Sequence, residues 1–264
     1  MRLTLYQIDA FADKLFSGNP AAVVPLDKWI DDQLMQNIAM ENNLAETAFF
    51  VPNGKLFDIR WFTPAAEINM CGHATLASAY VLYNLRGYDK PAITFNSKSG
   101  PLHTTRDKDM LYLDFPSWKP ERVEEYPGKL IASLGNPEIL GVYKHRDYVV
   151  ELHDEAAVRK IKPDFTLMKE AGQMVMVTAP GAASSEPIDF VSRFFAPTMG
   201  IDEDPVTGSA HSQLIPFWAE KLGKNKMYAK QLSRRGGDVH CELRGDRVSM
   251  GGKCVFYMEA VISV

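Results

Sequence analysis

One local pattern occurs twice in this chain, about half a chain length apart. Arg60-Trp61-Phe62-Thr63-Pro64 is followed by a short loop and Gly72-His73-Ala74, and Arg193-Phe194-Phe195-Ala196-Pro197 by a longer loop and Gly208-Ser209-Ala210. The offset is 133 residues from Phe62 to Phe195 and 136 from Gly72 to Gly208, close to half of the 264 residues. Chance similarity is the alternative. Two related lobes, each built as strand, loop, glycine and helix, explain the spacing.

Hydrophobic periodicity predicts three main helices, at residues 31–42, 73–83 and about 209–222. The second is apolar nearly all round, which indicates a helix buried on every side. Pro216 lies inside the third and is expected to bend it or remove a hydrogen bond. Short alternating or apolar runs predict strands at residues 3–8, 47–51, 58–62, 92–95, 110–115, 148–152, 174–178, 188–195 and 255–264.

The composition excludes several classes of protein. A net charge of −4 does not indicate a nucleic-acid surface. The three cysteines have no pair spacing, so a disulfide framework is not expected. Asp9 and Asp13 interrupt the N-terminal segment too early for a signal-peptide core. No run approaches the ~20 apolar residues of a membrane span, and we expect a cytoplasmic protein.

The segment from Pro116 to Gly128 contains three prolines and several charges, which is typical of a linker. The expected division is therefore an N-terminal lobe of residues 1–116 and a C-terminal lobe of residues 117–264. One option within this division is that the last strand, at about 253–264, crosses back to the N-terminal lobe.

Both repeats place a glycine at the start of a helix, at Gly72 and Gly208. Glycine lets a ligand approach the backbone closely, and the free N–H groups of a first helical turn attract anions. Two such starts on facing lobes could hold one small carboxylate between them. The alternative for each is a plain helix start without a ligand.

Four side chains near these glycines could carry chemistry, and each also has a structural interpretation. Glu46 is either a solvated residue at a strand entrance or, in a dry cleft, a general acid and base. His73 is either a structural histidine or a proton carrier. Asp204 either caps a local turn or orients a substrate. Cys71 is either a buried filler or a thiol with a lowered pKa at a helix start.

Metal and cofactor sites are not indicated by any motif. The chain has no His-x-x-x-His, no Cys-x-x-Cys and no acidic cluster with ligand spacing, and no glycine-rich nucleotide loop follows a strand. We therefore expect neither a metal nor a cofactor, so that protein acids and bases would do any chemistry.

Several long motifs, taken together, resemble the PhzF-like phenazine-biosynthesis family over essentially the whole chain. They appear in the family's order and are Ser17-Gly18-Asn19-Pro20-Ala21-Ala22-Val23-Val24, Asn42-Asn43-Leu44-Ala45-Glu46-Thr47-Ala48-Phe49, Arg60-Trp61-Phe62-Thr63-Pro64, Cys71-Gly72-His73-Ala74-Thr75-Leu76-Ala77 and Asp204-Pro205-Val206-Thr207-Gly208-Ser209-Ala210-His211.

The resemblance implies an α/β (α+β) fold of the diaminopimelate-epimerase type, with two pseudo-symmetric lobes. Each lobe would be a curved, mostly antiparallel sheet around a central helix, with the active site between the lobes. It also implies a homodimer and a cofactor-independent isomerase acting on a small carboxylic acid.

By motif, the proton-transferring glutamate would be Glu46, with His73 and Asp204 as polar partners. The substrate carboxylate would be held at Gly72, Gly208 and Ser209.

Related epimerases use two cysteines on opposite faces of the substrate carbon. Cys71 falls at the first position, but the second is Thr207, which is not a plausible carbon base. A Cys71-based racemase of an amino or hydroxy acid is therefore the second hypothesis. A non-catalytic small-acid binding protein is the third. Family resemblance indicates the kind of chemistry more firmly than the molecule, and the substrate stays open.

Overall fold

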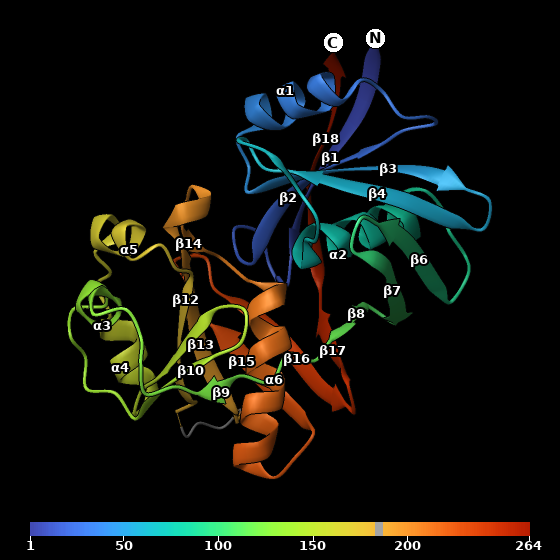
Figure 1. The fold of residues 1–264 in the computed structure, drawn as a ribbon. Coiled ribbons are helices and arrows are strands. Elements are labelled where there is room, and N and C mark those ends of the chain that lie inside the picture. The colour runs from blue at the N-terminus through green and yellow to red at the C-terminus, as the bar shows by residue number, and fades with distance from the viewer. Residues whose placement is uncertain (183–186) are drawn as a thin grey trace. The chain divides into compact units, whose positions relative to one another are not determined.

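The computed structural model describes residues 1–182 and 187–264. They form two compact units, which we call unit 1 (Met1–Phe115 and Met250–Val264) and unit 2 (Pro116–Ser249). The chain leaves unit 1 within strand β8 (Met110–Pro116) and returns within β17 (Arg247–Gly252). The final strand, β18 (Cys254–Ser263), therefore belongs to unit 1, where it pairs with β1 (Arg2–Ala10) (Figure 1).

Unit 1 is built on one sheet with the strand order β8-β7-β6-β4-β3-β2-β1-β18. The β2/β3 and β4/β6 pairs are parallel and the other pairs are antiparallel. The short strand β5 also pairs with β4. The remaining bounds are β2 (Asn19–Pro25), β3 (Glu46–Asn53), β4 (Leu56–Phe62), β5 (Glu67–Ile68), β6 (Ala92–Ser97) and β7 (Gly100–Asp107).

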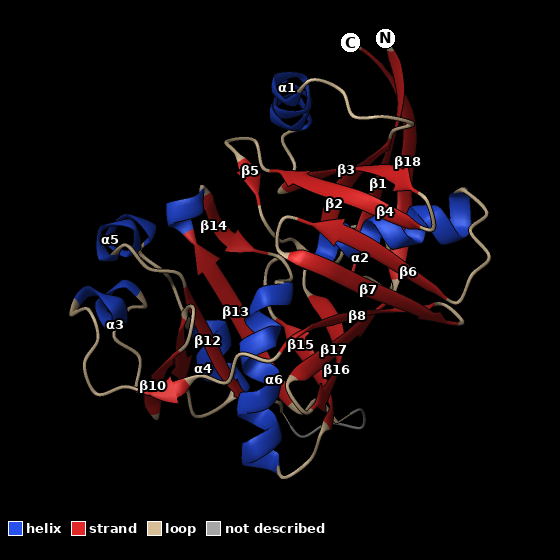
Figure 2. Ribbon diagram, turned by 45° about the vertical axis from the view of Figure 1, so that its right-hand side comes forward, coloured by secondary structure: helices blue, strands red, loops and turns tan. Residues whose placement is uncertain are grey.

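Helices α1 (Asp32–Asn42) and α2 (Gly72–Tyr80) lie on opposite faces of this sheet (Figures 1 and 2). Asp31 caps α1 by accepting a hydrogen bond from the Leu34 amide at 3.1 Å. The predicted helix at 31–42 is thus confirmed. The predicted helix at 73–83 forms as α2, which continues into a π-helical turn at Val81–Leu85. Every residue from 72 to 79 is buried, as its uniformly apolar sequence predicts.

Unit 2 contains strands in the order β16-β15-β13-β12-β11-β10-β9, with β14 added to β13. The long helix α6 (Gly208–Leu222) packs on one face of this sheet and three short helices cover the other (Figures 1 and 2). The strand bounds are β9 (Glu121–Arg122), β10 (Gly141–Lys144), β11 (Tyr148–Glu151), β12 (Val175–Pro180), β13 (Phe190–Ala196), β14 (Ile201–Asp204), β15 (Lys226–Gln231) and β16 (Gly237–Arg244). A 3₁₀ turn, Pro197–Met199, precedes β14.

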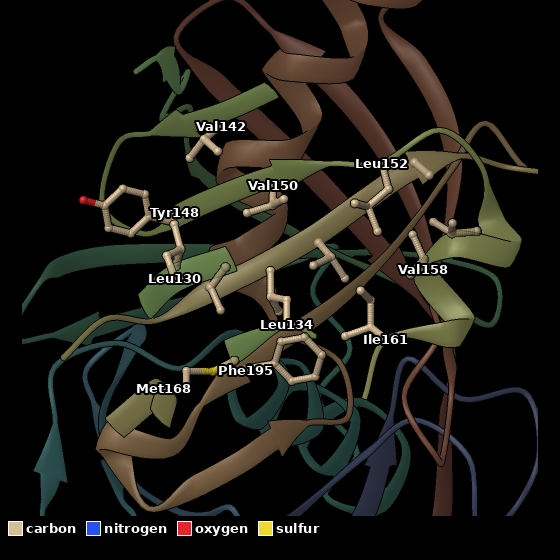
Figure 3. Packing of buried hydrophobic residues seen from close by; sticks show 14 residues of the cluster. Leu130, Leu134, Val142, Tyr148, Val150, Leu152, Val158, Ile161, Met168 and Phe195 are labelled. Atoms are coloured by element: carbon tan, nitrogen blue, oxygen red, sulfur yellow. The ribbon is translucent and has the colours of Figure 1, made fainter. Parts of the chain in front are cut away.

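The three short helices of unit 2 were not predicted from the sequence. They are α3 (Lys129–Ser133), α4 (Glu155–Lys160) and α5 (Phe165–Ala171). Each has at most seven residues, too few to show a repeated apolar face. The helices pack their buried side chains against the sheet (Figure 3). Leu130 and Leu134 of the α3 region and Val158 of α4 share one apolar cluster with the sheet residues Val150 and Phe195.

Helix α6 runs through Pro216 without ending there. A proline has no N–H to donate to the carbonyl four residues earlier, which here is that of Ser212. That carbonyl instead accepts the backbone N–H of Trp118 at 2.9 Å. The hydrogen bond predicted to be lost is therefore replaced by one from outside the helix.

Among the helices of the described residues, none is long and apolar enough to cross a membrane.

The two units repeat the same topology. Reading outwards from β7 and from β16, the successive pairs are antiparallel, parallel, antiparallel, parallel, antiparallel and antiparallel in both. Arg60 and Glu67 form a two-bond ion pair of 2.8 and 2.9 Å, and Arg193 and Glu203 form one of 2.7 and 3.0 Å. The repeat predicted from the sequence is thus a repeat of structure.

Candidate active site

Glu46 is the first residue of β3 and is 7% exposed, so it is not a solvated edge residue. In the parallel β2/β3 pair it stands opposite Ala21. Alternation along β3 places Phe49 and Val51 in the cluster that packs with α1. Glu46 has the opposite parity and points to the face covered by α2.

His73, the second residue of α2, lies beside Glu46. Its Nε2 is 3.0 Å from Oε2 of Glu46, and both side chains are less than one-tenth exposed. The two atoms are within ion-pair distance but are not aligned as a regular hydrogen bond. The other ring nitrogen, Nδ1, lies 3.1 Å from Nδ2 of Asn19 and 3.5 Å from Sγ of Cys71. A buried proton carrier and a buried carboxylate thus meet at the start of one helix.

Burial and the nearby Glu46 charge raise the pKa of the Cys71 thiol to about 11. The thiol is therefore protonated at neutral pH and is a poor base, contrary to the lowered pKa that a helix start alone would favour. Burial lowers the pKa of His73, but the charges of Cys71 and Glu46 outweigh it and raise the pKa above its usual value. Since Cys71 is neutral near pH 7, Glu46 is the partner that acts on His73 there.

Glu46, Cys71 and His73 are also the described residues whose donor atoms could hold a metal ion, because these atoms lie within 4.8 Å of one another. The geometry does not favour a common ion. Glu46 lies at Nε2 of the imidazole and Cys71 at Nδ1, and the two ring nitrogens point in different directions. An ion bound in line with either nitrogen would lie away from the partner of the other.

The corresponding helix start in unit 2 has a different set of polar groups. The Thr207 hydroxyl donates to Oδ2 of Asp204. The side-chain amide of Gln231 donates through Nε2 to the Asp204 backbone carbonyl at 2.8 Å. Its Oε1 accepts a hydrogen bond from the Thr207 backbone N–H at 2.9 Å. Asp204 and Thr207 are both buried. The hydroxyl of Thr207, the residue that the resemblance matches to the second base of a two-cysteine mechanism, is thus bonded to a carboxylate.

Ser209, the second residue of α6, accepts a hydrogen bond from the Arg146 guanidinium at 2.9 Å. Arg146 also binds the buried Asp147 at 2.6 Å and lies over the ring of Trp118. The Arg146 guanidinium is thus fixed beside the start of α6.

The structure brings together Glu46, Cys71, Gly72 and His73 in unit 1, and Asp204, Thr207, Gly208 and Ser209 in unit 2. Sequence reasoning did not assign a role to Asn19, Gln231 or Arg146. Asn19 belongs to the motif Ser17–Val24, and its place directly after Gly18 was the signal available in the sequence. Its complete burial is known only from the structure. Gln231 and Arg146 are 24 and 63 residues from their partners and gave no local signal.

A surface cavity of about 640 Å³ lies elsewhere in unit 2, lined among others by Leu134, His153, Asp154, Lys160 and Lys162. None of the predicted site residues lines it, so we do not place the chemistry there.

The chain was compared with known proteins. The family model described as "Phenazine biosynthesis-like protein" matches residues 8–260. An uncharacterised isomerase of Pseudomonas aeruginosa is 46% identical over 263 residues, covering 99% of each chain. Phenazine biosynthesis-like domain-containing protein 2 of mouse is 37% identical and covers 100% of both chains.

Among solved structures, a PhzF-family protein of Enterococcus faecalis has a TM-score of 0.95 and 45% identity, with 100% of both chains covered. A hydroxyproline epimerase of Agrobacterium vitis has a TM-score of 0.63 at 10% identity, over 99% of this chain and 92% of that one. This second likeness shows the fold alone.

Fold and relatives together define the class, a two-lobed isomerase of the diaminopimelate-epimerase-like architecture. Within that class, the chain belongs to the PhzF-like phenazine-biosynthesis family. The family and the fold class predicted from the sequence are confirmed.

Proposed function

We propose that this isomerase moves a proton between carbon atoms of a small carboxylic acid, with Glu46 as the general acid and base. The observation that carries the proposal is the buried Glu46 carboxylate beside His73, with 3.0 Å between Oε2 and Nε2. Glu46 would remove the proton from one carbon and return it to another, so no net proton is gained or lost. His73 would stabilise the carboxylate whenever it carries the charge.

The substrate carboxylate would be held by backbone N–H groups at Gly72, Gly208 and Ser209, with Asp204 orienting a polar group of the substrate. These roles rest on the family resemblance. The free N–H groups at the starts of α2 and α6 support them, since neither Cys71 nor Thr207 caps its helix through its side chain. A homodimer and a cytoplasmic location also stay predictions from the resemblance and the composition.

The racemase hypothesis requires Cys71 to act as a thiolate base. The raised pKa of its thiol, about 11, and the threonine at the second position both count against it. The binding-protein hypothesis predicts a ligand that binds saturably but exchanges no hydrogen. In that hypothesis Glu46 and His73 would only bind the ligand and would transfer no proton.

The experiment is a metabolite screen in heavy water, in which one carbon of a substrate gains deuterium only with active protein. With that substrate, Glu46→Gln should lower turnover by at least ~10²-fold, the usual scale of general acid–base catalysis. Cys71→Ser should cost much less. Glu41→Gln, which changes an exposed glutamate of α1, is the matched control and should leave turnover unchanged.

If Cys71→Ser abolishes turnover while Glu46→Gln is tolerated, the racemase hypothesis replaces this one. Saturable binding of a ligand without deuterium gain would favour the binding protein.

A further inference from the structure

Asn19 is fully buried at the start of β2 and reaches across 54 residues of sequence to His73. In the antiparallel β1/β2 pair it stands opposite Ala10, and Ala21, two residues further on, stands opposite Glu46 across the parallel β2/β3 pair. Residues two apart on a strand share a face. Asn19 and Glu46 therefore lie on the face of the sheet that α2 covers, on either side of the His73 ring.

The backbone before Asn19 is built to hold this position. Gly18 has φ of +65°, and a Cβ there would lie 2.2 Å from the Ala10 carbonyl oxygen, so no other residue fits. The amide of Phe16 donates to the buried carboxylate of Asp9 at 3.1 Å, and the Ser17 hydroxyl donates to the Lys14 carbonyl at 2.8 Å. The loop is thus tied to β1 through Phe16 and to itself through Ser17.

The contact with Asn19 determines which nitrogen of His73 carries the proton. An amide nitrogen only donates, so Nδ1 of His73, 3.1 Å away, must accept. The second neighbour of Nδ1 is the Cys71 thiol at 3.5 Å, and its raised pKa keeps it a donor as well. With donors at Nδ1, the ring proton belongs on Nε2, the nitrogen 3.0 Å from Glu46.

We propose that Asn19 is a positioning residue that keeps Nδ1 of His73 as the accepting nitrogen, so that a singly protonated ring carries its proton on Nε2, 3.0 Å from Glu46. An Nε2–H beside Glu46 stabilises the charged carboxylate, which is the form that can take a proton from carbon. The inference rests on the proposed function for its purpose, but not for its geometry.

Other titratable groups near His73 do not replace this effect. Strand β2 carries none, and Glu46 is the one on β3. Of the titratable groups around the ring, Cys71 and Glu46 are those that raise the pKa of His73. Further titratable side chains on the elements that pack against α2 include Tyr6 and Asp9 on β1, Tyr83 on the π-helical turn, and Cys254, Tyr257 and Glu259 on β18.

The test is nitrogen NMR of histidine-labelled protein, which distinguishes protonated from unprotonated ring nitrogens and needs no substrate. At a pH above the raised pKa of His73, where the ring carries one proton, the wild type should show unprotonated Nδ1 and protonated Nε2. Asn19→Asp places a carboxylate at Nδ1, so Nδ1 should become protonated and the ring should titrate at a higher pH. Asn19→Leu should remove the preference for one tautomer. Asn42→Asp is the matched control, because Asn42 bonds Thr47 next to Glu46 but not His73.

Activity on a substrate found by deuterium exchange gives a second readout. The kcat of Asn19→Asp should fall by up to ~10²-fold, the cost of misplacing a catalytic group, with little change in KM and a shifted pH profile. A singly protonated ring with its proton on Nδ1 in the wild type overturns the proposal. So does an unchanged tautomer in both Asn19 variants, or a tautomer lost in Cys71→Ala but kept in Asn19→Leu. If the tautomers behave as expected while Glu46→Gln stays active, the proposed function fails and Asn19 still positions His73.

Discussion

Histidines near the starts of α2 and α6 lie in opposite electrostatic surroundings. His73 has the carboxylate of Glu46 at 3.0 Å. His211 is fully buried, its ring lies 6.1 Å from that of Phe190, and its Nδ1 donates to the Thr207 carbonyl at 2.9 Å. Burial lowers the pKa of His211 to about 4. The same residue type thus lies beside a carboxylate in one unit and packs against an aromatic ring in the other.

His211 should make the protein less stable in acid. The folded form titrates near 4 and the unfolded form near 6.5, so between these values the unfolded chain binds the extra proton. The free energy of unfolding is then highest above about pH 6.5 and falls as the pH drops toward 4. At ~1.4 kcal/mol per pKa unit, the loss attributable to this residue is about 3 kcal/mol. Urea unfolding from pH 7 to pH 4 measures it.

The variant His211→Phe should be less stable at pH 7 but should lack this part of the acid loss. His240→Gln, a change at an exposed histidine of β16, is the control and should follow the wild-type curve. Parallel pH curves for wild type and His211→Phe would show that burial does not depress this pKa.

At the scale of elements, α2 and α6 begin in the same way. Cys71 and Thr207 precede them in extended conformation, with φ of −144° and −113°, and neither side chain caps its helix. The Thr207 hydroxyl bonds Asp204 and the Cys71 thiol lies beside His73. Neither helix start has a regular side-chain cap, and the helix dipole favours an anion at both.

Crystals grown with a small carboxylic acid should show its carboxylate at these helix starts. The oxygens should lie about 2.7–3.2 Å from backbone nitrogens near Gly72, His73, Gly208 or Ser209. The corresponding neutral amide should not bind, because it lacks the charge. A carboxylate found in the cavity lined by Lys160 and Lys162, with both helix starts empty, would contradict this prediction.

At the scale of the whole molecule, the chain folds into two units with one topology but unequal polar groups. Strand β18 pairs with β1 at the end of the unit 1 strand order, and β9 pairs with β10 at the equivalent end in unit 2. Unit 1 supplies Glu46 and His73, and unit 2 supplies Asp204 with the Thr207 and Gln231 side chains. Duplication explains the shared framework, and later substitutions explain why the two units carry different polar groups at equivalent helix starts.

The intact protein should not depend on a metal ion. Dialysis against EDTA should leave activity and Tm unchanged, because Glu46 and Cys71 lie at different nitrogens of His73. The purified protein should also show no visible absorbance. A metal present at one equivalent, removed by EDTA together with activity, would reassign Glu46, Cys71 and His73 as its ligands.

The sequence by itself determined the repeat, the two buried helices and the position of Glu46 at a strand entrance. Each of these depends on local spacing: a glycine before an apolar helix, or a change from a polar turn to an apolar strand. The sequence also placed Cys71, His73 and Thr207 at helix starts, since these residues are neighbours of Gly72 and Gly208.

Only the tertiary structure decided what those residues do to one another. The raised pKa of Cys71 depends on burial and on the Glu46 charge, which override the effect of the helix start. The Asn19–His73 contact depends on the register of β2 against β1 and β3, across 54 residues. A shift of one residue would turn Asn19 to the other face. Proton positions follow from such contacts, because a hydrogen bond depends on tenths of an ångström and local sequence patterns do not specify distances between strands.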